Sequence, residues 1–164
     1  MAVSKSKQSK VKQQLIAAGM TPYGLLKAEA KHLPNVITEN ENIGGVVYGL
    51  YKNDSLMIVA TNKRLLFLDH KFFYQKNDEL SYDVFSGVSY NIQGKFAGVV
   101  VHTRLGDYSL RFVNKKCAEN FVQFVETRSI VNGTQKQLKP NAVILSNGAP
   151  KNISQASISE TARI

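Results

Sequence analysis

Two pairs of adjacent basic residues are the places in this sequence where side chains could recognise an anion. The first pair, Lys63 and Arg64, follows the polar residues Thr61 and Asn62. The planar guanidinium group of arginine can hold a phosphate or a carboxylate through two parallel hydrogen bonds, so this pair is a candidate contact for an anionic ligand or partner. The alternative is a structural arginine, whose stem packs on the protein and whose head bonds a nearby carbonyl or acid.

The second pair, Lys115 and Lys116, follows Asn114, a residue type that often caps the start of a helix. A helix N-terminus has free N–H groups and partial positive charge, so two lysines there could add to an anion site. Plain exposure to solvent explains the pair equally well. The sequence therefore offers two candidate anion contacts and a structural alternative for each.

No arrangement of residues in the sequence points to catalysis or to a bound metal. The histidines His32, His70 and His102 lie in different predicted elements and lack the H-x-x-x-H spacing of a metal site. The single cysteine, Cys117, lies on an apolar stripe, where a thiol usually behaves as a small hydrophobe. The sequence has no P-loop and no GxGxxG motif. We therefore predict that the protein is not an enzyme and uses no metal and no cofactor.

The basic character of the chain is concentrated at its two ends. Of the formal net charge of +9, residues 1–32 contribute +5 and residues 130–164 contribute +3, whereas residues 33–129 contribute only +1. A DNA-binding domain usually carries a basic face on its folded core, so the near-neutral middle argues against nucleic acid as the main partner. The basic ends leave weak contact with an anionic membrane surface or with nucleic acid open.

The apolar runs of the sequence are short. None approaches the roughly 18 residues of a transmembrane helix, and the run Leu15–Met20 is shorter than the apolar part of a secretory signal. Because Cys117 is the only cysteine, no disulfide can form within one chain. We predict a cytoplasmic protein, with peripheral attachment at the membrane as an open alternative.

Seven predicted β-strands would position the basic pairs. Alternating or continuous apolar runs, separated by polar turns, are typical of strands in a sheet with one or two covered faces. Two of the turns are Asn53–Ser55 and Gly94–Lys95, and glycine can take the positive φ that a tight hairpin requires. The predicted strands are residues 46–52, 56–60, 64–68, 80–85, 88–92, 96–103 and 108–112.

Helices are predicted on both sides of the strands. Residues 4–18 and Pro22–Leu33 form two N-terminal helices, the second ended by Pro34, because the residue before proline disfavours the α region. A helix over Lys115–Arg128 carries apolar residues at helical spacing and should pack on the sheet. We predict three parts: a basic, partly helical segment 1–32, a domain over 33–129, and a polar, mostly disordered tail over 130–164 in which 142–145 is a candidate docking segment.

This layout resembles the bacterial pleckstrin-homology (PH) domains, and the YokE-like group in particular. The hairpin Val59–Phe67 reads as an apolar strand, Thr, a polar residue, Arg, Leu, an apolar residue and Phe. The segments Glu41–Gly49 and Tyr82–Val88 and the last helix follow in matching order, so the resemblance covers about residues 33–129. It implies an α+β, mainly β fold: a PH-like seven-stranded antiparallel barrel or sandwich capped by a C-terminal α-helix, with an N-terminal helical segment.

The resemblance implies a binding or assembly module. Its eukaryotic namesakes bind phosphoinositides with several basic residues around the first hairpin turn. Here Lys52 is the lysine that matches, Asp54 would repel a phosphate, and apolar residues follow from Leu56. Lys52 therefore stays a candidate anion or partner contact, although the sequence does not support phosphoinositide recognition in that mode.

We predict a non-catalytic PH-like module that binds a protein or peptide, and the partner can be a second copy of the chain in a homo-oligomer. Barrels of this kind have open strand edges and a groove near the closing helix, which suit strand addition or helix docking. The alternative is peripheral binding to anionic membrane lipid through the basic ends. Weak nucleic-acid binding through the same ends is a third, less favoured possibility.

Overall fold

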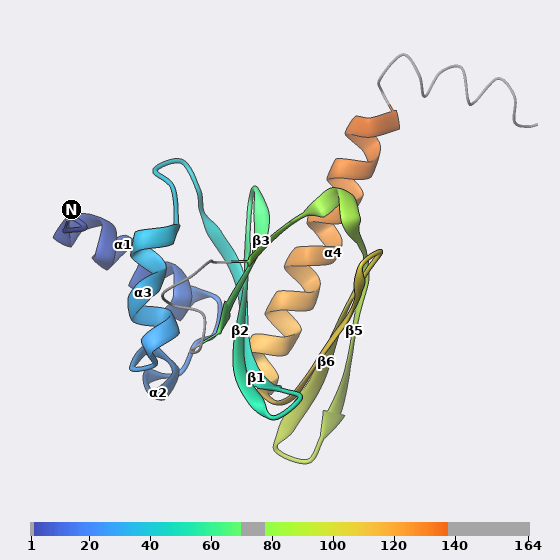
Figure 1. Ribbon diagram of the computed structural model, residues 1–164, viewed down its shortest axis with the longest axis horizontal. Coiled ribbons are helices and arrows are strands. Elements are labelled where there is room, and N and C mark those ends of the chain that lie inside the picture. The colour runs from blue at the N-terminus through green and yellow to red at the C-terminus, as the bar shows by residue number, and fades with distance from the viewer. Residues whose placement is uncertain (1, 70–77, 138–164) are drawn as a thin grey trace, which may run out of the picture. The chain divides into compact units, whose positions relative to one another are not determined.

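The structure is a computed structural model that describes residues 2–69 and 78–137. The chain divides into two compact units, Met1–Arg128 and Ser129–Ile164. In the first unit, three N-terminal helices precede a β-sheet and the start of a C-terminal helix (Figure 1). The helices are α1 (Lys5–Ala17), α2 (Pro22–Leu25), α3 (Ala28–Val36) and α4 (Lys115–Gln137).

One antiparallel sheet of seven strands forms the centre of the first unit, counted over the described residues. Its strand order is β4-β3-β2-β1-β7-β6-β5. Strand β1 joins the two halves, because it pairs with β2 along its length and with β7 at Leu50 and Tyr51. The predicted PH-like fold class is confirmed. The strands are β1 (Ile43–Tyr51), β2 (Asp54–Thr61), β3 (Arg64–Asp69), β4 (Asp78–Ser81), β5 (Phe85–Gln93), β6 (Phe96–Thr103) and β7 (Gly106–Asn114).

The first part of α4 packs against the sheet through the apolar stripe that the sequence predicts. Cys117, Phe121 and Val125 are buried in the same core as the inner faces of β1, β2 and β6. Two glycines of β1 allow this close approach, because a Cβ on Gly44 would overlap the ring of Phe124 and one on Gly45 would crowd Phe121. Figure 1 shows α4 beginning between the β1–β3 half and the β5–β6 half of the sheet.

The N-terminal helices share the core of the sheet. Val11 and Leu15 of α1 and Leu33 of α3 are buried in the same apolar cluster as the strands. The side chain of Asn120 on α4 also donates a hydrogen bond to the carbonyl oxygen of Ala18, 3.1 Å away. The boundary that we predict between residues 32 and 33 therefore falls inside α3, in a segment that packs with the sheet.

The predicted helix Pro22–Leu33 is wrong in its interior and at its end. It is divided into α2 and α3 by an extended residue, Lys27, and α3 continues through Pro34 to Val36. Pro34 removes one backbone hydrogen bond, but burial of Leu33 and Pro34 keeps the helix docked. A carbonyl at its end is also satisfied, because Arg64 donates to the oxygen of Val36.

The predicted strand over residues 80–85 is also wrong. Strand β4 ends at Ser81, a single 3₁₀ turn, η2 (Tyr82–Val84), follows, and β5 begins at Phe85. The side chain of Ser81 accepts a hydrogen bond from the backbone N–H of Asp83, which stabilises the turn. The buried hydroxyl of Tyr82 donates to the carbonyl oxygen of Thr61 at 2.6 Å. One local bond and one bond to a distant segment therefore override the alternating pattern.

The last helix is longer than predicted. It passes Arg128 and ends at Gln137, so residues 130–137 of the predicted disordered tail are helical. The apolar segment 142–145, the rest of the tail and most of the loop near 69–78 lie outside the described residues. The other strands match their predicted positions within three residues at each end.

Candidate functional site

Arg64, the first residue of β3, is surrounded by acceptors from its own chain. Its Nε and Nη2 atoms donate to the carboxylate of Glu41 at 2.9 and 3.0 Å. Nη2 also donates to the carbonyl oxygen of Val36 at 3.1 Å, and Nη1 pairs with the carboxylate of Glu79 on β4. Arg64 therefore makes the bidentate contact with a carboxylate for which arginine is suited, and this carboxylate belongs to its own chain.

Glu41 is the centre of this network, which the sequence did not single out. Its side chain is fully buried, whereas that of Arg64 is 22% exposed. The carboxylate also accepts from the hydroxyl of Thr61 at 2.7 Å and from the backbone N–H of Thr38 at 3.1 Å. Burial by itself would raise the pKa of Glu41, but these bonds and the charge of Arg64 lower it to about 2. Hydrogen bonding to Glu41 correspondingly raises the pKa of Arg64.

Lys63 and Lys52 lie at opposite ends of β2. Lys63 is exposed in the β2–β3 turn, where its Nζ atom lies 3.5 Å from the hydroxyl of Thr38. Lys52 occupies the β1–β2 turn with a φ of +57°, and its carbonyl oxygen accepts from Arg111. Because β2 has eight residues, the two turns are separated by roughly 25 Å along the strand. The two lysines cannot contact one small ligand.

Lys115 and Lys116 lie in the first turn of α4, as predicted. The side chain of Asn114 caps this helix, since it accepts from the backbone N–H groups of Lys116 at 3.0 Å and Cys117 at 3.2 Å. The cap uses donors that an anion would otherwise occupy. Lys116 is exposed and Lys115 is half-buried. The five predicted contacts are thus spread over three turns, and a role in binding for each stays a prediction.

The edge strand β5 presents a surface that residue types alone do not identify. In the described part of the chain the sheet order ends at β5, which pairs only with β6. Tyr90 and Ile92 lie opposite Val99 and Ala97, so they share the inner face of the sheet with those buried residues. Nevertheless Tyr90 is 41% and Ile92 is 49% exposed. An apolar edge is therefore open to solvent.

Ser89, His102 and Asp107 form a row of contacts on the opposite face of strands β5–β7. The Ser89 hydroxyl lies 3.2 Å from Nε2 of His102, and Nδ1 of the same ring lies 3.1 Å from the Asp107 carboxylate. This is the order of a nucleophile, a base and an orienting acid. However, the side chains of His102 and Asp107 are 39% and 58% exposed, and Ser89 is exposed too. Water reaches the whole row, so the environment that activates a serine is missing.

Other reactive groups are either buried or dispersed. Burial raises the pKa of the Cys117 thiol to about 11, so it is protonated at neutral pH. No group of three or more His, Cys, Asp or Glu side chains that could hold a metal occurs within residues 2–69 and 78–137. Among the described helices, none has the length and apolarity needed to span a membrane.

Comparison with known families identifies a match over the part of the chain that contains the sheet. Residues 37–127 of the chain match the family model described as a bacterial PH domain. The matched stretch begins after α3 reaches Val36 and ends within α4, so it contains the whole described sheet. Helices α1, α2 and α3 lie outside it. A search of curated proteins finds no match.

Solved structures with a similar arrangement include three at low sequence identity. The C-terminal domain of an unknown protein from Leishmania infantum is 12% identical, with a TM-score of 0.42, covering 60% of this chain and 92% of that one. The hSac2 domain from the human phosphoinositide phosphatase Sac2 is 11% identical, with a TM-score of 0.37 and coverage of 73% and 85%. A DUF1696 family protein with a pleckstrin-homology domain from Shewanella loihica is 18% identical, with a TM-score of 0.30 and coverage of 63% and 90%.

Proposed function

Because the chain belongs to the bacterial PH domain family, we propose that it is a non-catalytic binding module that takes a protein or peptide strand on the edge of β5. The family is usually non-catalytic. The observation that supports this edge is the pair Tyr90 and Ile92, which are exposed although their cross-strand neighbours are buried. An added strand would bond the outer backbone edge of β5, which pairs with no further strand among the described residues, and would cover both side chains.

The partner in this proposal can be a second copy of the chain. Two β5 edges could pair antiparallel and produce a symmetric dimer, because a two-fold axis places the same surface on both subunits. We do not propose nucleic acid or a metal ion as a ligand of this module. The proposed location of the module is the cytoplasm. Its single cysteine, buried in the core, is compatible with a reducing compartment.

Substitutions on the two faces of β5 test the proposal. Ile92→Lys places a charge on the apolar inner face, and Gln93→Lys places the same charge on the polar outer face of the same strand. The assays are light scattering of the full-length chain over a range of concentrations and selection of peptides from a random displayed library. We expect a dimer or enriched extended peptides, lost with Ile92→Lys and kept with Gln93→Lys. A monomer that enriches no peptide would contradict the proposal.

A separate assay tests whether the protein is non-catalytic, as proposed. Hydrolysis of p-nitrophenyl acetate reports on an activated serine, and Ser89→Ala removes the hydroxyl beside His102. We expect no initial burst and the same rate for the wild type and the variant. A burst that disappears in Ser89→Ala would show that the row on β5–β7 is a working nucleophile and would overturn this part of the proposal.

A second candidate function is binding to an anionic membrane surface through the basic N-terminal segment. Helix α1 contains Lys5, Lys7, Lys10 and Lys12 and no acidic residue. Deleting this segment would remove the buried residues Val11 and Leu15, so charge-neutralising substitutions are the better test. If the function is correct, Lys5→Gln combined with Lys7→Gln and Lys10→Gln should weaken co-sedimentation with phosphatidylglycerol vesicles, and salt should weaken it further.

A further inference from the structure

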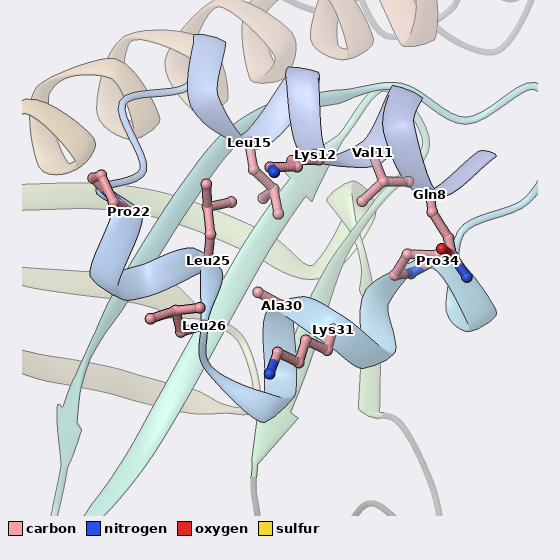
Figure 2. A pocket seen from close by; sticks show the side chains of 10 residues that line it. All are labelled: Gln8, Val11, Lys12, Leu15, Pro22, Leu25, Leu26, Ala30, Lys31 and Pro34. Carbon is pink, nitrogen blue, oxygen red and sulfur yellow. The ribbon is translucent and has the colours of Figure 1, made fainter. Parts of the chain in front are cut away.

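A groove runs between α1 on one side and α2 and α3 on the other (Figure 2). Its volume is about 640 Å³, which is within the range of ligand-binding clefts. The residues that line it are Gln8, Val11, Lys12, Leu15, Pro22, Leu25, Leu26, Ala30, Lys31 and Pro34. All of them precede residue 37, where the family match begins. The groove is therefore an addition to the part of the chain that the family model covers.

The floor of the groove is apolar and its mouth is open. Figure 2 shows Leu15, Leu25 and Ala30 pointing into the space between the helices. Val11 and Leu15 are almost completely buried, whereas Leu26 is 67% exposed. An exposed leucine at the side of an apolar groove contacts water until a partner covers it. The groove thus has both a formed base and an uncovered edge.

The charged residues that line the groove are both lysines. Lys12 and Lys31 line it, both are exposed, and none of the ten lining residues is acidic. Within residues 1–32, Glu29 is the only acidic residue, and it is 3% exposed. No carboxylate on this segment therefore stands in the solvent to balance the two lysines. The electrostatic complement of the groove is a negatively charged partner.

The open shape of the groove discriminates among negatively charged partners. A lipid acyl chain is apolar on all sides, so its solvent-facing half would stay in water. A flat bilayer surface would cover Leu26 but would not fill a concave floor. An amphipathic helix fits both features, because one face is apolar and the other is polar. On α1 the lining residues extend from Gln8 to Leu15, which corresponds to about two helical turns.

We propose that this groove binds an acidic amphipathic helix of a partner protein. Apolar residues of that helix at positions i, i+3 or i+4, and i+7 enter the floor beside Leu15 and Leu25. Asp or Glu residues at its sides face Lys12 and Lys31. This site is separate from the β5 edge and does not rest on the strand-addition proposal, since no residue is shared between the two surfaces.

Peptide selection with a matched counter-selection tests the proposal. The bait is the full-length chain, and the counter-bait is Leu26→Glu, which brings a negative charge to the mouth of the groove at an exposed position. The control is Leu105→Glu, because Leu105 is 75% exposed in the β6–β7 turn. Thermal melting of all three proteins establishes that they are folded. We expect enriched peptides with apolar residues at helical spacing and flanking Asp or Glu.

Binding of the best enriched peptide is then measured by fluorescence anisotropy. We expect Leu26→Glu to weaken it by about tenfold or more and Leu105→Glu to leave it unchanged. Lys12→Gln with Lys31→Gln should weaken it about two- to tenfold, whereas the exposed Lys95→Gln should have no effect. The Ile92→Lys variant of β5 should also bind normally, which distinguishes failure of this site from failure of the β5 edge.

Three results would overturn the proposal. The first is a selection in which no peptide prefers the wild type to Leu26→Glu. The second is enrichment of peptides that are basic or lack helical spacing. The third is binding of the chain to phosphatidylglycerol vesicles that is lost in Leu26→Glu, with no peptide enriched, since it would assign the groove to a membrane surface.

Discussion

The β2–β3 turn and the N-terminal groove are both basic, but they use their charge differently. Arg64 is bound on several sides by Glu41, Glu79 and the carbonyl oxygen of Val36, and its main partner is fully buried. Lys12 and Lys31 stand at the edge of an apolar cleft with no acidic residue among the lining groups. The charge of Arg64 faces acceptors of its own chain, whereas that of the two lysines is directed toward solvent and, in our proposal, toward a partner.

This difference shows why a basic motif in a sequence is a weak indication of a binding site. The pair Lys63-Arg64 combines one residue that is exposed with one that holds three segments of the chain together. What decides the role of an arginine is the presence of a buried carboxylate within reach. That carboxylate, Glu41, is 23 positions away in the sequence.

Removal of the buried charge should have the largest effect. Glu41→Gln offers one acceptor oxygen and an NH₂ group to donors from Thr38, Thr61 and Arg64. The NH₂ group then faces one of these donors, so a hydrogen bond is lost. Arg64 also loses its buried counter-charge. We expect the free energy of unfolding to fall by about 3 kcal/mol, measured by urea denaturation. Lys63→Gln, the adjacent exposed residue, should change it by less than about 0.5 kcal/mol. Equal effects of the two substitutions would contradict the comparison.

Lowering the pH should destabilise the protein through the same Glu41–Arg64 network. The pKa of Glu41 is about 2 in the folded chain and about 4.3 when unfolded, so the unfolded state binds the proton first. Ionised Glu41 therefore contributes to the free energy of unfolding. This contribution is fully present above about pH 4.5 and is lost as the pH falls toward 2. It should be on the order of 2–3 kcal/mol. Urea midpoints of the wild type between pH 5 and 2 should fall more steeply than those of Glu41→Gln, and parallel curves would refute the assignment.

Arg64→Lys should have a smaller effect than Glu41→Gln. Lysine keeps the positive charge beside Glu41 but cannot reach Val36 and both carboxylates in one planar arrangement. We expect a loss of about 1–2 kcal/mol in unfolding free energy. A variant as stable as the wild type would indicate that the point charge alone matters.

Neutralising the groove lysines should have the smallest effect on stability. Lys12→Gln with Lys31→Gln should shift the unfolding free energy by less than about 0.5 kcal/mol, because both side chains are exposed. The same double variant should weaken binding of a selected acidic peptide. Salt should weaken that binding in the wild type while it leaves the Glu41–Arg64 network largely unaffected, because buried pairs are screened less. A large loss of stability would place these lysines among structural residues.

The fold was predictable because its main signals are local and repeated. Period-two alternation in Tyr108–Phe112 and the helical stripe of Cys117, Phe121 and Val125 give the last strand and the last helix directly. The predictions failed where a bond between distant segments outweighs local preference. The helix through Pro34 is supported by Arg64, and the turn after Ser81 by a hydroxyl bond from Tyr82 to Thr61.

The binding surfaces were less predictable than the fold. The alternation of Val88, Tyr90 and Ile92 indicates a strand, but only the sheet order shows that this strand is an edge. The groove lies between helices that pack on one another, whereas the sequence predicts residues Pro22–Leu33 as one continuous helix. Its sequence signal is the concentration of lysine in residues 1–32, which contain a single acidic residue.

The most direct test of the central claim, that this chain is a binding module with its contacts away from Arg64, is a single peptide-display selection. The full-length wild type is the bait, and a variant that carries both Leu26→Glu and Ile92→Lys is the counter-bait. We predict that sequences survive the counter-selection and that they bind Lys63→Gln as tightly as the wild type. A selection in which no sequence distinguishes the wild type from the double variant would contradict the claim.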